Sequence, residues 1–333
     1  MNTDGTAFKN LHTFTGGSDG ANPYAGLVLS GTTLYGTANQ GGGAGNGTVF
    51  AVNTDGTGFK VLHSFTGGAD GSNPDAGLAI SSNVLYGTAG QGGSAGNGVV
   101  FAVNTDGTGF KALHSFTGGA VGANPSAGLA VSGTTLYGAA GQGGSGNGVV
   151  FSLNTDGTLF KTLHSFAGGA DGSGPSAGLL LSGTTLYGTA SQGGAANNGV
   201  IFSLNTDGTS FTNVYSFSAT APPGDNNTDG ALPHAGLLLQ AGVLYSTALQ
   251  GGSFAQGTLF ALTLGGSSTS PPTPIPLAIQ AAPGAVVLSW NGTGFSLQSA
   301  PVVNGVFTNI PATSGIYTNP ITAGQQFFRL ISN

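Results

Sequence analysis

One segment of about fifty residues recurs five times along most of this 333-residue chain. Each copy begins with the pentapeptide Asn-Thr-Asp-Gly-Thr, and successive starts are 51, 51, 50 and 51 residues apart. A period of this length, built from several short strands, is typical of the blades of a β-propeller. The repeat therefore predicts one continuous array over residues 1–264. The copies lie near residues 2–52, 53–103, 104–153, 154–204 and 205–264.

Within one copy the pattern predicts four short strands in up-and-down order. In the second copy, apolar runs cover residues 76–81, 84–89, 99–104 and 110–116, and turns rich in Gly, Ser and Asn separate them. An Asp-Gly pair in the last turn supplies the positive φ that a hairpin needs. The third run is apolar at successive positions, which indicates sheets covered on both faces by neighbouring blades.

The phase of the repeat predicts how the array ends. The chain opens with Phe8–Phe14, which has the sequence of a fourth strand, whereas the fifth copy ends after its third strand near Leu262. The N-terminal segment can therefore supply the missing fourth strand and remove the open edges of the ring. We expect an all-β chain, with a five-bladed β-propeller whose N-terminal strand closes the last blade.

The remainder of the chain predicts a second, smaller domain. Residues 265–275 are rich in Gly, Ser, Thr and Pro and have the composition of a linker. Residues 276–333 contain short apolar runs around Trp290, the only tryptophan. These runs predict a small antiparallel β-sandwich.

The composition excludes several functions. The chain has four Lys, one Arg, eleven Asp and no Glu, and the dispersed lysines form no basic patch that would follow a phosphate backbone. The absence of Cys excludes disulfides and thiolate zinc sites. The sequence contains neither a signal peptide nor an apolar run of spanning length. We expect a monomer without a transmembrane segment that does not bind nucleic acid.

Four short motifs recur through the copies: Leu-His-Ser-Phe, Asp-Gly-x-x-Pro-x-Ala-Gly-Leu, Leu-Tyr-Gly-Thr and Gly-x-Val-Phe. In strand order the copies resemble kelch blades, although the glycine and tryptophan spacing of kelch is not matched. They more closely resemble the Gloeobacter–Verrucomicrobia (GloVer) tandem repeat, over residues 2–264. The tail resembles the C-terminal module of the same bacterial surface and secreted proteins, through Phe295-Ser-Leu-Gln-Ser and Gln326-Phe-Phe-Arg-Leu. The resemblance implies an extracellular or cell-surface setting and brings no catalytic residues with it.

Two polar positions recur in the loops after strands four and two, which the strand order places on one face. As a ring, they would suit a glycan or a cation near the axis. The alternative is that they satisfy backbone groups of their own loops, which their repetition in every blade favours. The candidate ligand-binding residues are Asp19, Asp70, Asp171 and Asp229, with Val121 breaking the series, and Gln40, Gln91, Gln142, Gln192 and Gln250.

Four histidines share one position in the predicted fourth strand, and a tyrosine replaces them in the fifth copy. Outer strands of different blades are too far apart to share a zinc ion, which needs ligands within about 2.1 Å. We therefore expect these side chains to be structural hydrogen-bonding residues. They are His12, His63, His114 and His164, with Tyr215 in the fifth copy.

The fifth copy departs from the others in an enlarged loop. Its segment Asp225-Asn-Asn227-Thr-Asp229-Gly matches the first half of a calcium loop, but the later bidentate Glu is missing. The alternatives are a Ca²⁺ site at Asp225, Asn227 and Asp229 and an ordinary Asx-rich turn. His234 is the one histidine outside the repeat position, and with Asp225 and Asp229 it is a candidate general base or metal ligand. Tyr24 and Asp75, each unique to its copy, could line the same face.

Two functions remain compatible with these patterns. The first is an extracellular or cell-surface module that binds a glycan or a protein. The second is a secreted hydrolase or lyase with a metal- or carboxylate-dependent site at the propeller mouth. Uniform repetition and low charge favour the binding module, although propellers host both functions.

Overall fold

Two units make up the chain, Met1–Leu264 and Gly265–Asn333. The computed structural model describes residues 7–221, 226–264, 278–282, 285–289, 295–300, 308–310, 316–320 and 327–332. Asp225 of the proposed calcium loop, the linker at 265–275 and Trp290 lie outside the described residues.

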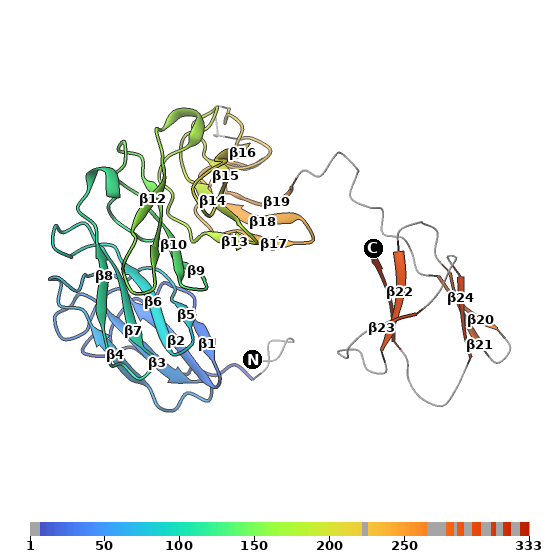
Figure 1. The fold of residues 1–333 in the computed structure, drawn as a ribbon, viewed down its shortest axis with the longest axis horizontal. Coiled ribbons are helices and arrows are strands. Elements are labelled where there is room, and N and C mark those ends of the chain that lie inside the picture. The colour runs from blue at the N-terminus through green and yellow to red at the C-terminus, as the bar shows by residue number, and fades with distance from the viewer. Residues whose placement is uncertain are drawn as a thin grey trace. The chain divides into compact units, whose positions relative to one another are not determined.

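The first unit contains five antiparallel sheets that follow one another in chain order (Figure 1). The first is β1 (Val28–Ser30), β2 (Thr33–Ala38), β3 (Thr48–Asn53) and β4 (Lys60–Ser64). The second is β5 (Ala79–Ser81), β6 (Val84–Ala89), β7 (Val99–Asn104) and β8 (Lys111–Ser115). The third is β9 (Ala130–Ser132), β10 (Thr135–Ala140), β11 (Val149–Asn154) and β12 (Lys161–Ser165). The fourth is β13 (Leu180–Ser182), β14 (Thr185–Ala190), β15 (Val200–Asn205) and β16 (Thr212–Ser216), and the fifth is β17 (Leu238–Gln240), β18 (Val243–Ala248) and β19 (Thr258–Thr263).

The up-and-down strand order predicted from the second copy is confirmed in the first four sheets. Neighbouring strands are hydrogen-bonded in sequence, and each sheet has its register shift at the same place, as between Val49 and Phe50. The first strands lie on the inner side of an arc and the fourth strands on its outer side (Figure 1). Loops that precede the first strands are therefore close to the inner side.

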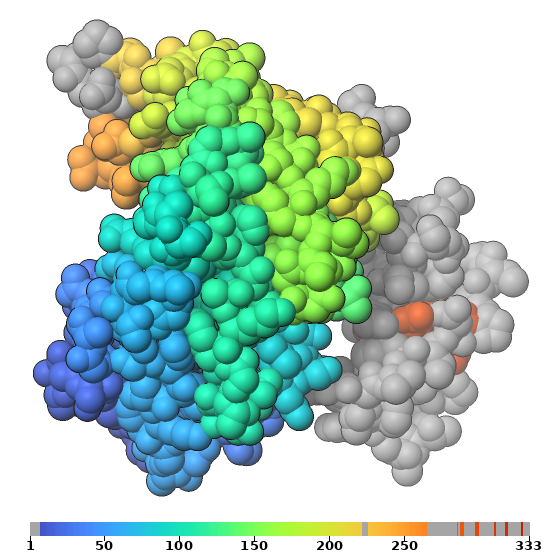
Figure 2. All heavy atoms as spheres, turned by 60° about the vertical axis from the view of Figure 1, so that its left-hand side comes forward, coloured from blue at the N-terminus to red at the C-terminus, as the bar shows by residue number. Residues whose placement is uncertain are grey.

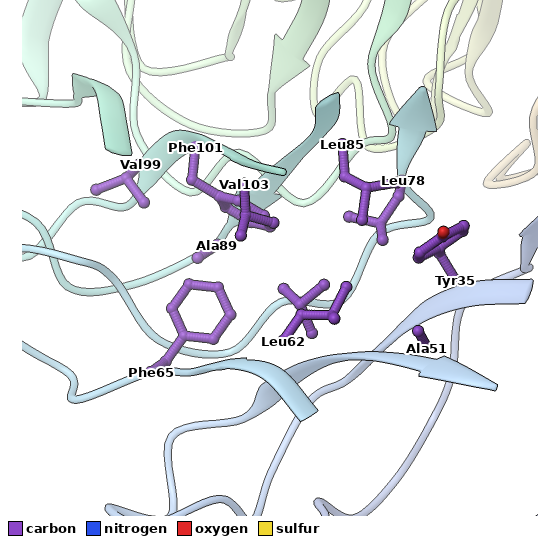
Figure 3. Close-up of a cluster of buried hydrophobic side chains, with 11 residues drawn as sticks. Tyr35, Ala51, Leu62, Phe65, Leu78, Leu85, Ala89, Val99, Phe101 and Val103 are labelled. Atoms are coloured by element: carbon purple, nitrogen blue, oxygen red, sulfur yellow. The ribbon is translucent and has the colours of Figure 1, made fainter. Parts of the chain in front are cut away.

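The hydrophobic core lies between consecutive sheets. One cluster combines Tyr35 and Ala51 of the first sheet with Leu85 and Phe101 of the second, and all four are buried (Figure 3). Because each inner sheet packs on both faces, its strands need apolar residues at successive positions. The prediction of sheets covered on both faces is thus confirmed for the inner sheets.

Every junction between sheets repeats the same backbone hydrogen bond, and three of the four junctions also repeat the same threonine hydrogen bond. At the second junction, the Asn124 N–H donates to the Asn97 carbonyl at 2.9 Å, and Thr88 Oγ1 donates to the Ala127 carbonyl at 3.0 Å. Pro125 packs so closely on Gly98 that a Cβ added to this glycine would lie 2.5 Å from Pro125 Cδ. The equivalent distances at the other junctions are 2.5, 2.5 and 2.4 Å, from Gly47 to Pro74, Gly148 to Pro175 and Gly199 to Pro233. Near-identical junctions hold successive sheets in near-identical relative positions, and Figure 2 shows the repeats in contact side by side.

The lysines beside the fourth-strand histidines contribute to these junctions. Lys111 Nζ donates to the Asp156 carbonyl of the following sheet at 2.6 Å, and Lys161 Nζ does the same to Asp207 at 2.6 Å. The ammonium groups therefore satisfy the carbonyl groups of the Asp-Gly turns and link one sheet to the next.

The predicted closure of a five-bladed ring is not confirmed. Residues 8–14 form no strand, and among the described strands β19 pairs only with β18. The sheets form an open arc with the first and last sheets at its ends (Figure 1). Leu259 on β19 is 80% exposed, whereas its counterparts Val49, Val100, Val150 and Ile201 are 0% exposed. Within the described residues of the first unit, the fifth sheet therefore has neither a fourth strand nor a covering neighbour.

The second unit consists of two three-stranded antiparallel sheets. One has the order β20 (Ala278–Ala282), β21 (Ala285–Ser289) and β24 (Ile316–Pro320), and the other has the order β23 (Thr308–Asn309), β22 (Phe295–Ala300) and β25 (Phe327–Ser332). Leu288 and Leu297 are buried, and the rings of Tyr317 and Phe328, from different sheets, are 6.3 Å apart. Contact between the two sheets is the arrangement expected for a small sandwich.

Helix is almost absent from the part of the chain that the structure describes. It consists there of two single 3-10 turns, η1 (Gly119–Val121) and η2 (Gly169–Asp171). Neither approaches the length or apolar character required to cross a membrane.

Candidate functional site

The loop that precedes the first strand of each sheet lies beside the loop that follows its second strand, as the strand order predicts. In the second sheet, the Ser72 N–H donates to the Gln91 carbonyl at 2.8 Å, and the Gln91 N–H donates back at 3.1 Å. The equivalent bridges join Ala21 with Gln40, Ala123 with Gln142, Ser173 with Gln192 and Ala231 with Gln250. The backbone of each glutamine is thus fixed, while its side chain is exposed.

The aspartates of the predicted ring are bonded within their own repeats. Asp70 accepts hydrogen bonds from the Thr66 N–H at 2.9 Å, from Thr66 Oγ1 and from His63 Nε2 at 3.1 Å. Partial burial works to raise the pKa of Asp70, but these hydrogen bonds outweigh it and the pKa is lowered. In the same way, Asp19 Oδ2 lies 3.1 Å from His12 Nε2, and Asp171 Oδ2 lies 3.3 Å from His164 Nε2. Their role as ligand contacts stays a prediction.

The structural role predicted for the fourth-strand histidines is confirmed where an aspartate is available. In the third copy Val121 takes the place of that aspartate, and His114 Nε2 is buried without a hydrogen-bond partner among the described residues. Burial lowers the pKa of His114. In the fifth copy Tyr215 replaces histidine and donates its hydroxyl to Asp229 at 2.7 Å, which raises the pKa of Tyr215 to about 12.

The described part of the enlarged loop reproduces the hydrogen bonds of the other copies. In the second copy the Gly68 carbonyl accepts the N–H groups of Gly71 at 3.1 Å and Gly93 at 2.8 Å. In the fifth copy Asn227 Oδ1 accepts the equivalent N–H groups, of Gly230 at 2.9 Å and Gly252 at 2.8 Å. The Asn227 side chain therefore stands in for a backbone carbonyl, as in an Asx-rich turn. Calcium binding stays a prediction, because Asp225 lies outside the described residues.

Of the candidate catalytic residues, Asp225 lies outside the described residues, and Asp229 and His234 have different hydrogen-bond partners. Asp229 binds Tyr215 and Ser218, whereas His234 Nδ1 lies 3.2 Å from Ser176 Oγ. Within the described ranges, no three acidic or histidine side chains are grouped so as to hold a metal ion.

Another position of the repeat, distinct from the aspartates described above, differs from copy to copy. It is the x of the motif Pro-x-Ala-Gly-Leu, which precedes the first strand of every sheet. Proline, alanine, glycine and leucine are constant in all five copies, whereas x changes. The five residues at x are Tyr24, Asp75, Ser126, Ser176 and His234. Sequence reasoning singled out three of them but missed the shared position and both serines, which aligning the five copies at this motif would have found.

The five motifs lie next to one another on the inner side of the arc. A Cβ added to Gly77 would lie 3.2 Å from the carbonyl oxygen of Gly26 in the preceding motif. A Cβ added to Gly128 would likewise lie 3.4 Å from the carbonyl oxygen of Gly77. Asn39 of the first sheet donates to Asp75 of the second at 2.5 Å. We call the five x residues and the five exposed glutamines the inner rim.

The inner rim is polar and weakly charged. Asp75 is open to solvent on one side, but the surrounding protein partly desolvates its carboxyl and raises its pKa, against the hydrogen bond from Asn39. Asn22 Nδ2 donates a hydrogen bond to Gln40 Oε1 at 2.8 Å, so two side-chain amides are joined close to Tyr24 in the sequence. Such a surface can offer hydroxyl, amide, imidazole, carboxylate and aromatic groups to one ligand.

Residues 1–148 and 119–271 match the model of the Gloeobacter/Verrucomicrobia repeat. The chain belongs to this family. The resemblance read from the repeated motifs is thereby confirmed, and the Gloeobacter/Verrucomicrobia repeat accounts for all five sheets of the first unit. No curated protein matches the sequence.

Several solved structures are similar to this Gloeobacter/Verrucomicrobia repeat protein. A chain in the crystal structure of a nidogen/laminin complex is 15% identical, with 65% of this chain and 68% of that chain covered and a TM-score of 0.44. TolB from Acinetobacter baumannii is 14% identical, with 84% of this chain and 61% of that chain covered and a TM-score of 0.40.

Proposed function

We propose that this protein is an extracellular or cell-surface binding module whose inner rim recognises an uncharged glycan. The observation that carries the proposal is the variation at one solvent-accessible position in otherwise similar repeats, which is exposed in three copies and half-buried at the two serines. The constant residues of the motif serve packing, because Pro74, Ala76 and Leu78 are buried. A position that varies, lies on the inner side and needs no particular residue for folding is the place where recognition can be encoded.

The chemistry of the inner rim favours a carbohydrate. Carboxylate and amide groups, such as those of Asp75 and Gln91, hydrogen-bond hydroxyl groups well, and an exposed aromatic ring such as Tyr24 packs on the apolar face of a sugar. No lysine or arginine belongs to the inner rim, while Asp75 would repel a second anion. These groups favour an uncharged glycan over an acidic one.

A glycan array probed with the labelled full chain tests the proposal. Asp75→Asn and Tyr24→Ala should each weaken binding by about tenfold or more, since each removes a direct contact. Asp106→Asn is the matched control, because it makes the same charge change in a turn at the opposite end of the strands. Binding that is absent, or equally strong in all three variants, would contradict the proposal.

A second candidate function is ester or amide hydrolysis. It is favoured by the 3.2 Å contact between Ser176 Oγ and His234 Nδ1, because a histidine that accepts a serine proton activates the hydroxyl as a nucleophile. Hydrolysis of activated esters by the full chain tests it. Ser176→Ala should abolish turnover and Ser126→Ala should leave it unchanged, since Ser126 occupies the same position without a histidine neighbour. Equal rates in both variants would exclude this function.

A further inference from the structure

The last sheet exposes a surface that is buried or half-buried in the other sheets. Tyr245 is 39% exposed and Leu259 is 80% exposed, whereas Tyr86 and Val100, their counterparts in the second sheet, are 6% and 0% exposed. Ala261, on the same strand as Leu259, is exposed as well. Isolated apolar residues on a surface need no explanation, but a contiguous face with the sequence of an interior junction does.

The first sheet exposes the opposite half of such a junction. Leu11, Phe14, Leu27 and Phe50 line an open pocket there. In the interior the corresponding residues are Leu62, Phe65, Leu78 and Phe101, and they form one buried cluster together with Tyr35, Val49 and Ala51 of the preceding sheet. The pocket at the first sheet is therefore shaped for a tyrosine, a branched aliphatic residue and an alanine. Those residue types are the ones exposed on the last sheet, as Tyr245, Leu259 and Ala261.

The strand edges are complementary in the same way. Among the described strands, β19 has no fourth-strand partner of the kind that β3, β7, β11 and β15 have, and residues 8–14 carry the fourth-strand sequence without forming a strand. The register follows from the other sheets, where Ala51 faces Lys60 and Ala102 faces Lys111. By the same register Ala261 would face Lys9.

The chain's own N-terminal end does not fill the gap. The first and last sheets stand at opposite ends of the open arc (Figure 1), and the near-identical junctions between the sheets fix the curvature that keeps them apart. A second copy of the chain presents the required pocket and strand without bending any junction.

We propose that two copies of this protein associate head to tail, with the last sheet of one copy seated on the first sheet of the other. Tyr245, Leu259 and Ala261 of one copy fill the pocket lined by Leu11, Phe14 and Leu27 of the other, and residues 8–14 of that copy pair with β19. Because the two surfaces differ, the contact is heterologous and leaves a free end on each copy for further association. The contact is independent of the inner rim and replaces the monomer expected from the sequence.

Engineered cysteines test the register directly, because this sequence contains no cysteine. Full-length Lys9→Cys and Ala261→Cys proteins are mixed under mild oxidation, so that a disulfide between them can only join different copies. We expect a Lys9–Ala261 linked dimer at a yield at least tenfold above that of Lys9→Cys mixed with Leu159→Cys. Leu159 is a suitable control, since it is exposed in the third sheet, away from both ends.

Two results would overturn the proposal. One is the absence of a cross-linked dimer above the control level. The other is a double variant, Lys9→Cys with Ala261→Cys, that cross-links only within one chain, which would establish ring closure by the chain's own N-terminal segment.

Sedimentation provides a second measurement. The mean mass of the natural chain should rise with concentration, and Leu259→Asp should keep it at the mass of one chain. Leu259 is exposed in the single chain, so this change leaves the fold intact, which an unchanged melting temperature at low concentration would verify. Equal mass distributions for both proteins would also contradict the proposal.

Discussion

The imidazole of His63 lies flat on the ring of Phe110 in the next sheet, with the ring centroids 3.6 Å apart and the planes 8° apart. Its Nε2 is held by Asp70 of its own repeat at the same time. One side chain thus ties the loop of its own sheet to the face of the next. Equivalent stacks join His12 with Phe59, His114 with Phe160 and His164 with Phe211.

This arrangement predicts that the free energy of unfolding falls as the pH drops from about 7 to about 5. Burial lowers the pKa of His63, His114 and His164 in the folded chain below the ordinary value of about 6.5. A lowered folded-state pKa means that protons bind the unfolded chain better. The stability is therefore complete above the ordinary pKa and is lost as the pH falls through the lowered values.

Thermal melts across this pH range measure the effect. Replacing His114 with Phe removes one of the titrating rings, so the decline should become shallower in that variant. A melting temperature that stays constant between these pH values would contradict the prediction.

Val121→Asp should stabilise the protein. Val121 and Asp171 end equivalent 3-10 turns, so an aspartate at 121 would reach His114 Nε2 as Asp171 reaches His164. Providing a partner for a buried, unpaired nitrogen is worth about 1 kcal/mol or more. Denaturant unfolding should show this gain, and the gain should vanish in a background that carries His114→Phe. A gain that persists without His114 would assign it to another cause.

Asn227→Ala should destabilise the protein by about 1–3 kcal/mol, because it leaves the N–H groups of Gly230 and Gly252 without an acceptor. The measurement is the unfolding free energy with and without EDTA. If Asn227 acts as a turn residue, the loss is the same in both conditions. A loss that EDTA reproduces in the natural chain would instead support the calcium site.

Gly87→Ala should destabilise the protein by about 1–3 kcal/mol through overpacking. A Cβ at Gly87 would lie 2.5 Å from Phe101 Cζ and 2.8 Å from Leu78 Cδ2. Gly26→Ala is the matched control, because a Cβ there has no atom within 4 Å. Denaturant unfolding of the two variants should separate them clearly, and equal stabilities would show that the core relaxes around the added methyl group.

Sequence reasoning succeeded for features that local chemistry determines. The strands of the second copy, the Asp-Gly turns and the structural histidines all follow from residues close together in the chain. It missed the contact between Ser176 and His234, because these residues are 58 apart in the chain and meet only when two sheets pack side by side. It also did not foresee Asn227 as a substitute for the Gly68 carbonyl, since that equivalence is visible only in the hydrogen bonds.

By itself, the sequence determined the repeat family, the strand order of each sheet and the two-sided burial of the strands, because period, turn residues and apolar runs act over a few residues. Only the tertiary structure decided the curvature of the array. The angle between sheets depends on contacts such as Pro125 against Gly98, which join segments of different repeats and leave no local pattern. That angle leaves the arc open and exposes Leu259 at one end and Leu27 at the other.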